Sequence, residues 1–156
     1  MFKLKNKKGV SLIELIVVIG IIGIMAAVSI VSLTKARNET AVEGEADKIV
    51  AVIREAQNYA LTGKSADSDC YKYRVSVSNS GKYSLENIKS TLEVCSLDYE
   101  FPLENGVSSA ISSSVTFDAP HAIVSSTGVI FSLSRGGYIC RVSINSVGLI
   151  TKNCSY

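Results

Sequence analysis

The sequence is poor in the residues on which most active sites depend. Its single histidine, His121, follows Pro120 in a predicted turn and has no partner with which to build a Ser–His–Asp triad. The four cysteines show none of the close pairs that bind zinc. The tripeptide GKS at residues 63–65 resembles the end of a phosphate loop, but Asn58 occupies the position of the required earlier glycine. We therefore expect no enzyme activity, no metal and no cofactor.

The chain also lacks an excess of positive charge where a nucleic acid could bind. It has 16 Lys and Arg residues against 14 Asp and Glu residues, but four of the lysines precede Gly9, so 12 basic residues remain against the 14 acidic ones. Its aromatic residues do not alternate with a basic stripe. Such a surface offers neither the electrostatic nor the stacking contacts of nucleic-acid recognition, and we expect no nucleic-acid partner.

What the sequence does contain is a long apolar run at residues 10–33, in which Glu14 is the only charged residue. As a helix, these 24 residues would extend over about 36 Å, enough to cross a hydrocarbon core of about 30 Å. The preceding lysines predict that this end faces the cytoplasm and that the rest of the chain lies outside. The alternative is an ordinary secretory signal cleaved near Ala27 or Ser29, but its apolar region would be shorter, about 7–15 residues.

Residues 34–63 continue the helical pattern in a more polar sequence. Their apolar residues recur at intervals of four and three, as on one face of a helix packed against a domain. These residues are Val42, Ala46, Ile49, Ile53, Ala56 and Ala60. The charged residues Glu43, Glu45, Lys48, Arg54 and Glu55 are predicted to lie mostly off this stripe. Gly63 is predicted to end the helix, and Gly44 could bend it.

From residue 70 onward the pattern changes to short alternating runs separated by turns. The first run places Tyr73, Val75 and Val77 on one face, and a turn at residues 79–81 returns the chain as a partner strand. Further runs cover residues 90–101, 113–117, 122–125, 129–134, 138–144 and 149–154. They predict an α+β fold, with the helix packed on one antiparallel sheet or on a pair of sheets. The predicted segments are a leader at 1–9, a membrane-spanning helix at 10–33, its continuation at 34–63 and a β-rich domain at 64–156.

The four cysteines, Cys70, Cys95, Cys140 and Cys154, all follow the apolar run. An even number on one side of a membrane predicts disulfides in an oxidising compartment, with free buried thiols as the alternative. Four cysteines allow three connectivities. We expect Cys70–Cys95 and Cys140–Cys154, because this pairing closes loops within neighbouring strands and a turn at residues 145–148 brings the second pair nearly opposite.

Glu14 is the unusual residue of the N-terminal segment, because an unpaired charge at the start of a lipid-length helix is costly if it is carried inward. Ser11 and Glu14 fit the S-x-x-E pattern of a capping box, in which the two side chains bond to the backbone of the first helical turn. The alternative is that Glu14 has a charged partner in an assembled state. The two interpretations are compatible, since one describes a monomer in the membrane and the other an assembly.

The stretch KKGVSLIEL resembles the prepilin N-terminus of type IV pilins and type II secretion pseudopilins, usually written G-F-T-L-I-E. The resemblance covers about the first 30 residues. It implies that a membrane prepilin peptidase cuts after Gly9 and methylates the new N-terminus at Val10, and that Glu14 is the family's acidic residue for assembly. Gly23 matches a glycine often found in the family. Val10 replaces the usual phenylalanine, and Val31 stands where many pilins have a proline, so that the helix keeps a backbone donor there.

Three later stretches, SSVTFDAP, VIFSLS and VSINSVGLI, resemble the last strands of H-type minor pseudopilins and minor pilins. Cys154 near the C-terminus is similar to the position that closes the last loop of many pilins by a disulfide. The resemblance implies a structural subunit of a pilus or pseudopilus that spans the inner membrane once and is then extracted into a filament outside. Its partners would be other pilin subunits, the prepilin peptidase, the membrane assembly platform and membrane lipid. The alternative from another class is a membrane-anchored binding module that never polymerises.

Overall fold

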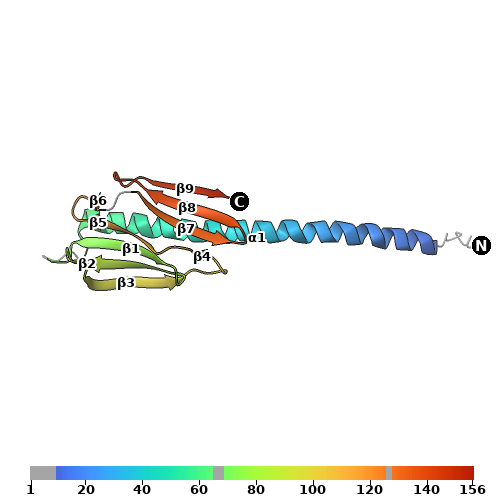
Figure 1. The fold of residues 1–156 in the computed structure, drawn as a ribbon, viewed down its shortest axis with the longest axis horizontal. Helices are drawn as coiled ribbons and strands as arrows, with labels where there is room; N and C mark the ends of the chain where they lie inside the picture. The colour runs from blue at the N-terminus through green and yellow to red at the C-terminus, as the bar shows by residue number, and fades with distance from the viewer. Residues whose placement is uncertain (1–9, 65–68, 126–127) are drawn as a thin grey trace, which may run out of the picture. The chain divides into compact units, whose positions relative to one another are not determined.

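The computed structural model describes residues 10–64, 69–125 and 128–156. It divides the chain into two compact units, Met1–Arg37 and Asn38–Tyr156, which are considered separately. One α-helix, α1 (Leu12–Thr62), contributes to both units, and the strands follow it in the second unit (Figure 1). Gly9, the residue before the predicted cleavage point, lies outside the described residues.

The end of α1 is set by Gly63, as the sequence predicted. Gly63 has a φ of +65°, a backbone conformation that most other residues avoid. The amide of Lys64 donates to the carbonyl of Tyr59 at 3.3 Å, which is the six-to-one hydrogen bond of a Schellman C-cap. Val31 and Gly44 both lie within α1, and Gly44 is exposed.

In the second unit, the predicted stripe of α1 forms the centre of the core. All six stripe residues from Val42 to Ala60 are buried. The prediction for Glu45 was wrong, because its side chain is only 1% exposed. Glu45 lies three residues after Val42 and four before Ile49, so it shares their face of the helix. One of its carboxylate oxygens accepts a hydrogen bond of 2.8 Å from Lys48, which also contacts Glu104.

The strands form two antiparallel sheets, an outcome that the sequence left open. The five-stranded sheet has the order β3-β2-β1-β5-β6 and the four-stranded sheet the order β4-β7-β8-β9. Their bounds are β1 (Lys72–Ser78), β2 (Lys82–Ile88), β3 (Val94–Pro102), β4 (Ser108–Ser109), β5 (Ser113–Asp118), β6 (Ile123–Val124), β7 (Val129–Arg135), β8 (Tyr138–Ile144) and β9 (Ile150–Ser155). Sequence reasoning missed β4, which is too short to show a period of two.

The first hairpin follows the predicted pattern. Tyr73, Val75 and Val77 of β1 are buried, and the alternate residues of the strand are only half-buried. Gly81 ends the turn with a φ of +78° and donates its amide to the carbonyl of Ser78 at 3.1 Å. The hairpin therefore places one apolar face of the five-stranded sheet in the shared core with α1.

Both predicted disulfides are present. Cys140 and Cys154 are directly opposed in the register of β8 and β9, with their Cα atoms 4.0 Å apart. Cys70 and Cys95 have Cα atoms 6.3 Å apart. For Cys70–Cys95, the expected reason, that the bond closes a loop between neighbouring strands, was wrong. Cys70 precedes β1 and Cys95 lies on β3, and β2 separates those two strands in the sheet.

Candidate functional site

The candidate site is the N-terminal part of α1. Ser11 precedes the first helical residue, and its carbonyl accepts a hydrogen bond of 3.2 Å from the amide of Leu15. This is the arrangement of an N-cap residue, whose carbonyl accepts the first bond of the helix. The cap places Glu14 in the first turn of α1, where a negative charge favours the positive end of the helix dipole.

The side chains of Ser11 and Glu14 do not form the capping box. Across the described ranges 10–64, 69–125 and 128–156, neither side chain makes a hydrogen bond or an ion pair. Glu14 is exposed, so its carboxylate is accessible to a group outside this chain. The backbone of Ser11 therefore explains where the helix starts, but it does not explain why an acidic residue stands at position 14.

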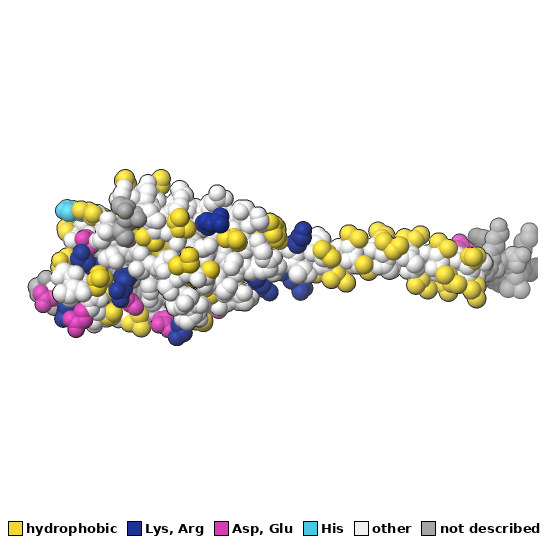
Figure 2. All heavy atoms as spheres, in the orientation of Figure 1, with side chains coloured by type: hydrophobic (Ala, Val, Ile, Leu, Met, Phe, Trp, Pro, Cys, Tyr) yellow, Lys and Arg dark blue, Asp and Glu magenta, His cyan; other side chains and the backbone are white. Residues whose placement is uncertain are grey.

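The rest of this helical segment is an apolar surface. Every residue from 10 to 37 is exposed, and an 18-residue window of α1 has a mean hydropathy of 2.8 with none of it buried. Figure 2 shows hydrophobic side chains over this part of the helix. The hydroxyls of Ser29 and Thr34 donate to the carbonyls of Met25 and Ile30 four residues earlier, at 2.9 and 3.0 Å. These polar groups are thereby satisfied within the helix, as an apolar environment requires.

An uncovered apolar helix with a single carboxylate in its first turn suits a membrane or a bundle of similar helices better than water. The model of the prokaryotic N-terminal methylation motif matches residues 4–30, which include this carboxylate and most of the apolar run. This match, together with the long apolar helix, supports an assignment to the type IV pilin and pseudopilin family, whose precursors the prepilin peptidase processes. The apolar helix of this pilin-like chain fits a membrane anchor.

The matched motif ends within the first compact unit. Neither the search of curated proteins nor that of solved structures finds a match for the chain. The architecture of the pilin-like chain, one long N-terminal helix followed by antiparallel sheets, comes from the structure itself.

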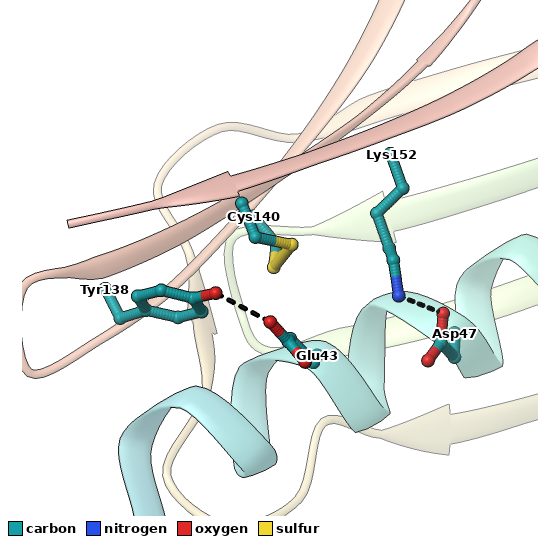
Figure 3. Close-up of a disulfide and its surroundings, with 6 residues drawn as sticks. Glu43, Asp47, Tyr138, Cys140 and Lys152 are labelled. Atoms are coloured by element: carbon teal, nitrogen blue, oxygen red, sulfur yellow. Dashed lines mark hydrogen bonds and ion pairs between the residues drawn. A yellow bond between two sulfur atoms is a disulfide. The ribbon is translucent and has the colours of Figure 1, made fainter. Parts of the chain in front are cut away.

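In the second unit, a group of polar contacts joins the four-stranded sheet to α1 beside the Cys140–Cys154 disulfide (Figure 3). The hydroxyl of Tyr138 donates to Glu43 at 2.6 Å, and Lys152 forms an ion pair with Asp47. The hydrogen bond to Glu43, together with burial, raises the pKa of Tyr138 to about 12. Sequence reasoning did not identify these contacts, although the spacing of four between Glu43 and Asp47 places both on one side of the helix.

Proposed function

We propose that this chain is a structural subunit of a type IV pilus or of a type II secretion-like pseudopilus. It is made as a precursor, cut after Gly9, methylated at Val10 and held in the inner membrane by residues 10–33. An assembly platform then extracts it into a filament outside, where these helices pack together. The observation that carries the proposal is the uncovered apolar surface of α1, most of which lies within the matched methylation motif, with one carboxylate in its first turn.

Glu14 has a specific role in this proposal. In a filament its carboxylate lies in an apolar bundle, where an unpaired ion costs several kcal/mol. Cleavage after Gly9 creates a cationic amine on Val10, which in an adjacent subunit can neutralise Glu14. Any other axial stagger of the two helices leaves both charges buried and unpaired, so the pair fixes the register of assembly.

The alternative, a membrane-anchored module that does not polymerise, uses the same helix as an anchor only. In this alternative, nothing explains why Glu14 has no partner within the described chain. The two proposals therefore differ in where the mature protein is found and in whether Glu14 matters.

The test is to shear surface filaments from cells and to compare them with the membrane fraction. We expect the chain in both fractions, and the mass of its N-terminal peptide should correspond to a methylated Val10. A protein found only in the membrane fraction would support the anchored module. A mature N-terminus near Ile30 would contradict the processing step, because it would remove most of the assembly helix.

A further inference from the structure

Charge is distributed unevenly between the two sheets of the second unit. Residues 93–104, which include β3 and are called here the acidic edge, contain four acidic residues and no basic one. They are Glu93, Asp98, Glu100 and Glu104. Residues 119–156, which include all of β7, β8 and β9, contain three basic residues and no acidic one. The two sheets therefore have segments of opposite charge.

These segments lie on opposite sides of the domain. β3 is the outermost strand of the five-stranded sheet and β9 the outermost of the four-stranded sheet. The sheets meet at β5 and β7, where the hydroxyl of Ser113 donates to the carbonyl of Ile130 at 3.0 Å. Figure 1 shows β3 and β9 at the two opposite margins of the domain, with α1 between them. Of the three basic residues, Arg141 alone lies on the outer surface of β7–β9, called here the basic face, because the register partners of Arg135 and Lys152 on β8 are buried.

Most of these charges are already paired within the chain. Three of the acidic residues form ion pairs, Glu93 with Lys89, Glu100 with Lys82 and Glu104 with Lys48. On the basic side, Lys152 pairs with Asp47 of α1. Asp98 and Arg141 are exposed, and neither forms an ion pair or a hydrogen bond with any residue that the structure describes. The acidic edge and the surface around Arg141 thus each present one exposed charge, of opposite sign, that forms no ion pair in the described chain, although Asp98 attracts Lys64 electrostatically.

We propose that the acidic edge of one subunit docks on the basic face of a second copy of this chain, with Asp98 paired to Arg141. This inference rests on the proposed function. The two complementary surfaces belong to one chain and lie at opposite margins, so the contact joins unlike surfaces of identical subunits. A contact of that type does not close on itself in a two-fold dimer and propagates from subunit to subunit, as a helical filament requires.

Apolar side chains beside both charges add to the contact. Leu97 on β3, next to Asp98, is 52% exposed, and Ile130 of β7, whose register partner on β8 is Ser143, is 49% exposed. Apolar area at the centre of an interface contributes affinity, while the charge pair selects the partner and the register. The arrangement therefore contains both components of a specific contact.

The contact is made by side chains and not by the addition of a strand to β3. The register of β3 with β2 is interrupted twice, between Leu85 and Glu86 and between Asn87 and Ile88, and the strand ends at Pro102. Bulges, acidic side chains and proline at a sheet edge oppose continuous pairing with another strand. The irregular edge thus prevents indiscriminate sheet extension and leaves Asp98 exposed.

The experiment exchanges the two charges in the full-length chain in cells. Asp98→Arg and Arg141→Asp are made singly and together, and the yield of sheared filaments is normalised to the membrane pool. Each single variant should lower the yield about tenfold, because it places like charges at the contact. The double variant restores the opposite pair and should recover most of the yield. Arg54→Asp is the matched control, since Arg54 is exposed on α1 and belongs neither to the acidic edge nor to the basic face, and it should give a normal yield.

Each other outcome contradicts the contact. Normal yields from both single variants would show that the two surfaces face solvent. Low yields without recovery in the double variant would show that they contact something other than each other. Mobility on non-reducing gels checks that every variant keeps both disulfides. A wild-type chain that is absent from filaments overturns the proposed function as well, whereas wild-type filaments with variants that do not recover overturn the contact alone.

Discussion

The hydroxyl of Tyr138 on β8 donates a hydrogen bond of 2.6 Å to the carboxylate of Glu43 on α1, across 95 residues of sequence. The ring of Tyr138 also packs edge-on against Tyr156, with centroids 4.9 Å apart. Tyr138 lies two residues before Cys140 in β8, on the same face of the strand as that disulfide cysteine, so this contact fixes the position of the C-terminal hairpin on the helix.

Stability that depends on this hydrogen bond should be lost at high pH. An unfolded tyrosine has a pKa of about 10, and in the folded protein the pKa of Tyr138 is raised to about 12. The contribution is therefore complete below pH about 10 and disappears as the pH rises through about 12. Tyr138→Phe should lower the free energy of unfolding at neutral pH and flatten this decline, as measured by urea denaturation at several pH values. Tyr71→Phe is the control, because Tyr71 makes no hydroxyl hydrogen bond in the described chain, and an equal effect there would contradict the prediction.

A chain that begins at Thr34 should be a soluble, folded monomer. It retains the unit Asn38–Tyr156 with both disulfides and loses the uncovered apolar helix. Size-exclusion chromatography measures its oligomeric state, and circular dichroism measures its secondary structure. Aggregation with the disulfides intact would show that the anchor extends into the domain.

Gly136→Ala should destabilise this soluble domain by about 2 kcal/mol. Gly136 has a φ of +57°, and a Cβ there would clash with the side-chain amide of Asn38. Gly137→Ala is the control, because its φ is +88° but its Cβ would meet no atom within 4 Å. Adding Asn38→Ala to Gly136→Ala should recover the steric part of the loss. Equal losses for the two alanine variants would mean that backbone strain alone is responsible.

Lys48→Ala should lower the free energy of unfolding by about 2 kcal/mol, because it leaves the buried carboxylate of Glu45 without its cation. Glu104→Ala removes the other, exposed partner of Lys48 and should change stability little. Denaturant unfolding of the two variants side by side makes the comparison. A larger effect from Glu104→Ala would show that Glu45 is stabilised in another way.

Glu14→Gln should leave membrane insertion and cleavage after Gly9 intact and greatly reduce incorporation into filaments. Glutamine keeps the shape of the side chain but cannot neutralise the Val10 amine of a neighbour. Ser11→Ala is the comparison variant: the Ser11 side chain makes no hydrogen bond in the described chain and alanine keeps the backbone bond to Leu15, so the filament yield should stay normal. The measurement is filament yield normalised to the membrane pool. A normal yield from Glu14→Gln would show that Glu14 acts only at the start of the helix and not in assembly.

Much of the local structure could be predicted from the sequence, because helices and strands impose their own spacing on apolar residues. The period of α1 identified all six buried stripe residues, and Gly63 marked the helix end because few other residues adopt its backbone conformation. The methylation motif and Glu14 were likewise readable, since their residues are contiguous.

Other features depended on how distant segments meet. No pattern in the sequence separates one sheet from two, or indicates that Tyr138 reaches Glu43 and that Gly136 packs against Asn38. The burial of Glu45 was missed because its charge was taken as a sign of exposure, although its position in the helix repeat faces the core. The opposed charges of Asp98 and Arg141 were visible in the sequence, but only the pairing of the strands placed them on two different sheets. The spacing of apolar residues in the sequence predicts which residues share a face of one helix or strand. Contacts between different helices and strands depend instead on the path of the whole chain.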